Sequence, residues 1–218
     1  MELMGIDSSK VINLFHAFRP EGQVYQFDLV KEFVDQYSFA KFPTIEELMK
    51  REYNFAVGRF GDIQIQEFAI YGDGVIASSA SDTDKLVAFI EDIKKWSGEK
   101  FGLVPAVGSK PEIYFESVLV IKAEVDLVAV AKPAADIVAL IQRAFRQATS
   151  IEGTYYPTGF ITDINSEGFP GRRKPIQYMI ERRVGVPFAD NVFHCRAPLP
   201  TKAHLASLRA IEDFARRA

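Results

Sequence analysis

Residues 61–96 read GDIQIQEFAIYGDGVIASSASDTDKLVAFIEDIKKW, and this stretch contains the pattern that decides the fold. Two apolar runs, 63–71 and 75–77, flank the sequence Gly72-Asp73-Gly74. Glycine tolerates the positive φ that tight hairpin turns require, and aspartate accepts it. The arrangement therefore predicts two antiparallel strands joined by a short turn.

Helical spacing begins directly after this hairpin. Ser81 or Asp82 provides an N-cap, and the apolar residues that follow recur every three to four positions. We expect this helix to pack its apolar stripe on the sheet and to end at Gly98. Within the hairpin, the first strand changes its apolar face near Gln66 and Glu67, which indicates either a bulge there or burial on both faces.

The order of hairpin and helix recurs along the chain. It is clear again at 175–217 and less clear at 113–148. This recurrence predicts an α+β fold with a largely antiparallel sheet and helices packed on one face. We expect one domain over residues 1–218, built from two structurally similar halves that meet near 100–112.

The N-terminal region fits two patterns. Residues 10–18 match both helical and strand spacing, and residues 24–27 read as a strand after a turn at 20–22. We interpret this region as a hairpin, followed by a helix that Asp28 caps. Further on, the sequence Thr-Ile-Glu-Glu at 44–47 is a capping-box pattern, which predicts a short helix.

The cleanest amphipathic stripe of the chain follows Pro133. Proline suits the first turn of a helix, because its missing N–H is not needed there. An apolar stripe of this kind normally faces the core, so we expect the sheet to cover it. The stripe consists of Ile137, Leu140, Ile141, Ala144 and Phe145.

Composition indicates a globular protein without covalent cross-links. The chain has 218 residues, including 18 phenylalanines and 8 tyrosines, so its size requires no disulfide or metal for stability. Its one cysteine, Cys195, excludes an intramolecular disulfide. The N-terminal residues lack the features of a signal peptide, and no apolar run approaches the roughly 20 residues that span a bilayer. We expect a soluble cytoplasmic protein with no membrane partner.

Charge is distributed unevenly along the chain. Residues 1–109 contain 17 acidic and 11 basic residues, a net charge of −6. Residues 110–218 contain 12 acidic and 15 basic residues, a net charge of +3. Such asymmetry points to a polyanion, an acidic partner or the self-association of oppositely charged ends.

Catalytic patterns are weak. The sequence contains no motif for a phosphate loop, a dinucleotide or a metal, so we predict no cofactor and no metal site. Cys195 and His204 are the catalytic candidates. A thiolate nucleophile needs an imidazole within reach, and His194 points to the opposite face of its strand from Cys195, whereas His204 lies early in the last helix. Buried structural cysteines are much commoner than activated ones, which ranks this pair low.

A basic cluster is the best candidate for a binding site. Gly171 and Pro175 bracket three consecutive cations on a loop, and two more cations follow on the next strand. Tyr155, Tyr156 and Tyr178 are near in sequence. Cations and aromatic rings together suit single-stranded nucleic acid, through phosphate neutralisation and base stacking. The alternative interpretation is a solvated loop. The cluster consists of Arg172, Arg173, Lys174, Arg182 and Arg183.

Arg182 needs a separate interpretation, because it continues the apolar row of the strand at 176–184. A buried arginine needs a partner. Alternatively, the strand ends there and the stem of the side chain carries the guanidinium to solvent, and we favour this second interpretation.

Three functions follow from these patterns. The leading hypothesis is a non-enzymatic protein-interaction or assembly module that binds a protein partner or itself, because opposed charge and strand edges suit association. The second is a nucleic-acid or polyanion binder that uses the basic cluster. The third is a small cysteine-dependent hydrolase or transferase that uses Cys195 and His204.

Overall fold

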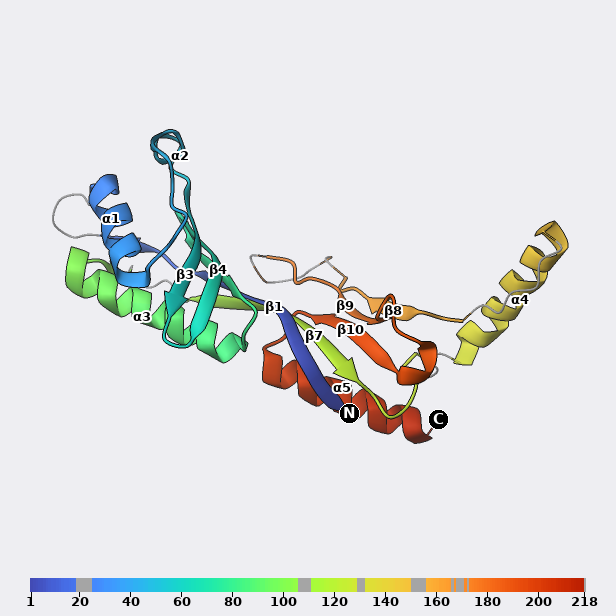
Figure 1. Ribbon diagram of the computed structural model, residues 1–218. Helices are drawn as coiled ribbons and strands as arrows, with labels where there is room; N and C mark the ends of the chain where they lie inside the picture. The colour runs from blue at the N-terminus through green and yellow to red at the C-terminus, as the bar shows by residue number, and fades with distance from the viewer. Residues whose placement is uncertain are drawn as a thin grey trace. The chain divides into compact units, whose positions relative to one another are not determined.

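The protein has an α+β fold, as the hairpin–helix pattern predicts (Figure 1). The computed structural model describes residues 1–18, 25–105, 111–128, 132–149, 156–165, 167, 171 and 173–217. The elements are, in chain order, β1 (Glu2–Leu14), β2 (Ala17–Phe18), α1 (Gln26–Tyr37), α2 (Ile45–Met49), β3 (Tyr53–Phe60), β4 (Ile63–Tyr71), β5 (Gly74–Ser79), α3 (Thr83–Phe101), β6 (Val104–Pro105), β7 (Glu112–Lys122), α4 (Lys132–Thr149), β8 (Gly159–Thr162), β9 (Tyr178–Arg182), a 3-10 helix η1 (Phe188–Asp190), β10 (Val192–Ala197) and α5 (Thr201–Arg217).

Eight strands form one sheet in the order β3-β4-β5-β1-β7-β10-β9-β8, and β2 pairs with β6 separately. Read inward from one edge, the first half of the sheet is β3-β4-β5-β1. Read inward from the other edge, the second half is β8-β9-β10-β7, which is the same arrangement. A meander of three strands ends beside the strand that opened its half, so β5 lies beside β1 and β10 lies beside β7. A helix then follows each meander, α3 after β5 and α5 after β10. The chain therefore repeats one arrangement, and the predicted α+β class with recurring hairpin–helix units is confirmed.

Internal packing divides the chain into two compact units, which we call unit 1 and unit 2. Unit 1 comprises Met1–Gly5, Val118–Ala197 and Lys202–Ala218. Unit 2 comprises Ile6–Ser117 and Pro198–Thr201. Strands β1 and β7 each contribute residues to both units.

Helix α3 begins where the sequence predicts it and ends later. The carboxylate of Asp82 accepts a hydrogen bond from the backbone N–H of Asp84 (2.8 Å), which caps the first turn. The helix continues through Gly98 and ends at Gly102, where φ is 65°. The prediction that Gly98 ends the helix is therefore wrong. A glycine inside a helix is only modestly unfavourable, and the left-handed residue at the C-terminus ends the helix.

Strands β3 and β4 both change the face that they bury. The buried residues are Phe55 and Gly58 in β3, and Ile63, Ile65 and Phe68 in β4, so each strand contains two successive buried residues that are three positions apart. The pairing register is the same on both sides of this change, so neither strand carries an extra residue. Val57 has a φ of 57°, a left-handed conformation that is rare for a β-branched residue. The facing change is therefore shared by both strands and is not a bulge in one of them.

An aromatic core fills unit 2 between the sheet and helices α1 and α3. The ring of Phe33 stacks on Phe68 at 5.6 Å and meets Trp96 edge-on at 5.0 Å. Phe39 packs over Gly58, where a Cβ atom would lie 2.3 Å from the ring, so glycine is needed at that position. The stripe of α3 is buried here, as predicted. The large buried aromatic residues are Phe33, Tyr37, Phe39, Phe55, Phe68 and Phe89.

The N-terminal region corrects two predictions. Helix α1 begins at Gln26, so the strand expected at 24–27 is wrong, and the turn expected before it lies outside the described residues. Residues 11–13 are buried in succession, because β1 is an inner strand of the sheet, and this weakens the period-two signal. Asp28 lies in the first turn of α1 and not at the N-cap, which is Tyr25.

Candidate protein-docking surfaces

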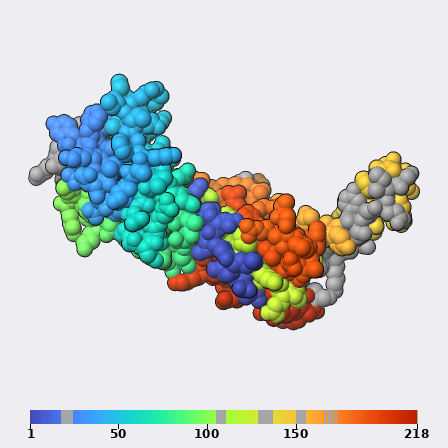
Figure 2. All heavy atoms as spheres, viewed as in Figure 1, coloured from blue at the N-terminus to red at the C-terminus, as the bar shows by residue number. Residues whose placement is uncertain are grey.

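Helix α4 presents its apolar stripe to solvent. Ile137, Leu140 and Ile141 are 59%, 62% and 47% exposed, so the prediction that the sheet covers the stripe is wrong. Figure 1 draws α4 in yellow, and Figure 2 shows atoms of α4 in the same colour. Periodicity predicts an apolar face but does not identify what covers it. Exposed apolar side chains gathered on one face are typical of an interaction site.

Basic side chains lie on α4 after its first turns. Between residues 137 and 149 they are Arg143 and Arg146, and both are exposed. Residues three or four apart are neighbours on a helix, so Arg143 lies beside Leu140 at the border of the stripe. This face therefore suits an apolar surface that is bordered by carboxylates.

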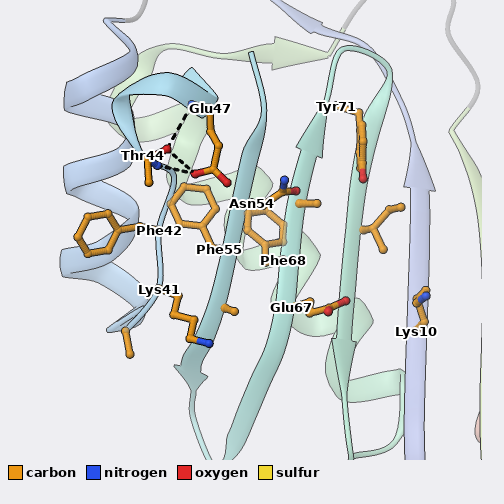
Figure 3. Close-up of a pocket in the computed structure, with 14 residues that line it drawn as sticks. Lys10, Lys41, Phe42, Thr44, Glu47, Asn54, Phe55, Glu67, Phe68 and Tyr71 are labelled. Atoms are coloured by element: carbon orange, nitrogen blue, oxygen red, sulfur yellow. Dashed lines mark hydrogen bonds between the residues drawn. The ribbon is translucent and has the colours of Figure 1, made fainter. Parts of the chain in front are cut away.

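A second surface is a pocket of about 690 Å³ on the sheet of unit 2 (Figure 3). Successive residues of a strand point to opposite faces. Phe68 belongs to the buried core, so its neighbours Glu67 and Ala69 point the other way and line the pocket. Residues of β1, β3, β4 and β5 form its floor, and the segment that leads into α2 forms one wall. The pocket thus opens on the sheet face that α3 does not cover.

Aromatic rings and a fixed carboxylate border this pocket. Phe42 and Tyr71 line it and are 53% and 54% exposed. The carboxylate of Glu47 accepts hydrogen bonds from the backbone N–H (2.7 Å) and the hydroxyl (2.8 Å) of Thr44. The hydroxyl of Thr44 accepts the backbone N–H of Glu47 in return (3.3 Å), so the predicted capping box is confirmed. These hydrogen bonds hold a negative charge at the rim and lower the pKa of Glu47 below its usual value, mainly through the backbone N–H of Thr44.

A row of alternating charge crosses the same face. Glu67 lies opposite Ala56 on one side and Ser78 on the other. Lys41 lies opposite Ala56 on the far side, and Lys10 lies opposite Ser78 on its far side. The sequence alone does not predict this pocket. The signal was present in the polar residues that alternate with apolar ones in β4, but alternation alone does not distinguish a functional face from a solvated one.

The structure describes the predicted basic cluster in part. Arg172 lies outside the described residues. Lys174 forms an ion pair with Asp163, with 3.0 Å between Nζ and Oδ2. Arg173 and Arg183 are exposed. A role for these residues in binding nucleic acid stays a prediction.

Arg182 is held inside unit 1. Its Nη2 atom lies 2.5 Å from Oδ2 of Asp126, and Nη1 donates to the carbonyl of Phe188 at 2.9 Å. The guanidinium also lies over the rings of Phe188 and Phe193, at 4.7 and 5.2 Å. Its side chain is 10% exposed, so the interpretation that it reaches solvent is wrong. Asp126 supplies the counter-charge that a buried arginine needs, and the loop that contains η1 adds a hydrogen-bond acceptor.

Cys195 and His204 both lie in the core of unit 1. Burial raises the pKa of the Cys195 thiol to about 12 and lowers the pKa of the His204 imidazole to about 4. Both groups are therefore neutral near pH 7, whereas a nucleophilic cysteine needs a lowered pKa. His204 meets the ring of Tyr178 edge-on at 5.6 Å. The surroundings of the pair are those of packed residues. Among the described residues, no group of His, Cys, Asp or Glu is arranged to hold a metal ion.

Comparisons with known proteins give little more. No protein-family model matches the chain. No curated protein matches it either. A solved structure described as Methanococcus jannaschii TBP is similar over 98% of this chain and 98% of its own, with 15% sequence identity and a TM-score of 0.43. A likeness of this size carries no argument about function. No helix in the described part of the chain has the length and apolar character needed to cross a membrane.

Proposed function

We propose that this protein is a non-enzymatic interaction or assembly module and that the exposed stripe of α4 is its docking surface. This proposal rests on the exposure of Ile137, Leu140 and Ile141. The apolar residues of α4 have the spacing of a helix that packs on a core. A helix gains most of its stability in proteins from packing its apolar face. A partner would supply the packing that the chain's own sheet does not.

Other observations favour this function over the two alternatives. A nucleic-acid site would need cations that are available to phosphates, and Arg182 and Lys174 are engaged by carboxylates. A cysteine-dependent enzyme would need an activated thiol, and burial has the opposite effect on Cys195.

The experiment is site-specific photo-crosslinking in cells that produce the full chain. A photoreactive residue replaces Leu140, in the stripe, or Ala139, which is exposed and lies about 160° around the helix from Ile137 and Ile141. We expect Leu140 to give one predominant protein adduct, identified by mass spectrometry, and Ala139 to give little of it. Equal adducts from both positions, or none from Leu140, would contradict the proposal.

A further inference from the structure

The two units carry opposite charge. Unit 2 contains 18 acidic and 12 basic residues, a net charge of −6, and unit 1 contains 11 acidic and 14 basic residues, a net charge of +3. Two copies of the chain therefore attract each other when unit 1 of one copy approaches unit 2 of the next, whereas like units repel.

We infer that the surface which α4 recognises is the sheet-face pocket of unit 2 in a second copy of this chain. The inference rests on the proposed function, because it names the partner of the same stripe. The stripe offers aliphatic side chains with arginines at its border, and the pocket offers exposed rings together with two carboxylates, Glu47 and Glu67, and two lysines, Lys10 and Lys41. In this arrangement apolar groups meet apolar groups, and the arginines of the stripe can pair with the two carboxylates.

The stripe has the spacing of a docking helix, and the pocket has the volume of a binding site. Ile137, Leu140 and Ile141 lie within about one turn of helix, in the i, i+3, i+4 spacing by which helices anchor in grooves. The pocket volume of about 690 Å³ lies in the range of roughly 300–1,000 Å³ typical of ligand sites. The small residues Ala56 and Ala69 leave this space open, and Glu67 lies within it where Arg143 can pair with it.

The contact is heterologous, since α4 and the pocket are different surfaces. Head-to-tail contacts of this kind form closed rings or open chains of subunits, and a pairwise dimer is not the natural end point. Association should rise with protein concentration and weaken with salt, because part of the attraction is between charges.

The decisive experiment mixes two variants of the full chain in light scattering. Leu140→Glu removes the stripe, and Glu67→Lys reverses the charge in the pocket. We expect the wild type to form oligomers and each variant alone to associate at least about tenfold more weakly. An equimolar mixture should form a 1:1 dimer and nothing larger, because one intact stripe and one intact pocket remain. Ala139→Glu is the control and should associate as the wild type does.

Other outcomes overturn the inference. If Leu140→Glu blocks association while Glu67→Lys and Asn54→Lys, a second charge change in the pocket, have no effect, then α4 binds another surface. A wild type that stays monomeric at all concentrations also overturns it. In either case an adduct from position 140 with a different protein would leave the proposed function standing. Far-ultraviolet circular dichroism checks that each variant is folded.

Discussion

Thr83 and Thr201 exchange hydrogen bonds. The backbone N–H of Thr83 donates to Oγ1 of Thr201 (3.1 Å), and the N–H of Thr201 donates to Oγ1 of Thr83 (2.9 Å). Both residues are buried, and each is the first residue of the helix that follows its meander, α3 or α5. The first N–H groups of a helix have no partner within it. Each of these two threonines therefore satisfies such a group in the other.

Removing either hydroxyl should destabilise the protein. Thr83→Val or Thr201→Val keeps the shape of the side chain but leaves the other residue's N–H buried without an acceptor. We expect a loss of about 1–2 kcal/mol in the free energy of unfolding for each. Thr83→Ser keeps the acceptor and should cost less. Urea unfolding followed by circular dichroism gives the values, and a Thr83→Val variant as stable as the wild type would contradict this role.

Two aspartates that pair with cations, Asp126 and Asp163, should differ in how much they stabilise the protein. Asp126→Asn should cost about 2–4 kcal/mol, because it leaves a guanidinium that is 10% exposed without its counter-charge. Asp163→Asn removes the partner of Lys174, a side chain that is 46% exposed, and exposed pairs contribute only about 0–1 kcal/mol. Chemical unfolding of both variants tests the contrast. Equal losses would mean that Arg182 finds another partner.

His204 predicts a pH dependence of stability. Burial lowers its pKa to about 4 from an ordinary value of 6.5, so between these values the unfolded chain binds a proton that the folded protein does not. Stability should therefore be fully present above pH 6.5 and fall as the pH decreases towards 4, by at most about 2–3 kcal/mol from this residue.

His204→Leu isolates this effect from that of the carboxylates. His204 is the fourth residue of α5, counted from Thr201, and Leu86 is the fourth residue of α3, counted from Thr83; both are fully buried. The variant should lose less stability than the wild type between pH 6.5 and pH 4. If the wild type and the variant lose the same stability between pH 6.5 and pH 4, the imidazole of His204 is protonated in the folded protein as readily as in the unfolded chain.

The fold should tolerate a charged residue on the apolar stripe of α4. Leu140→Glu should change the free energy of unfolding by no more than about 0.5 kcal/mol, because the side chain is 62% exposed. Leu86→Glu, on the buried stripe of α3, should cost several kcal/mol, since it places a charge in the core. Thermal or urea unfolding distinguishes the two positions. A comparable loss at Leu140 would mean that α4 packs into the core.

Local patterns predicted much of the fold. The Gly72-Asp73-Gly74 turn, the Asp82 cap and the Thr44 capping box depend on residues close in sequence, so the sequence alone identifies them. The N-terminal strand was harder to predict, because burial on both faces removes alternation.

The candidate sites were less predictable, for a different reason. The stripe of α4 and the stripe of α3 have the same spacing, and only tertiary structure shows that one is covered and the other exposed. The partners of Arg182 and the residues of the pocket come from elements that are distant in sequence. No local pattern reports such neighbours.

The central claim is that α4 binds a protein through its apolar stripe. Its most direct test is photo-crosslinking from position 140 in the full chain, compared with position 139. We expect a single predominant protein adduct from position 140 that is largely absent from position 139. The same adducts at both positions, or no adduct at position 140, would contradict it.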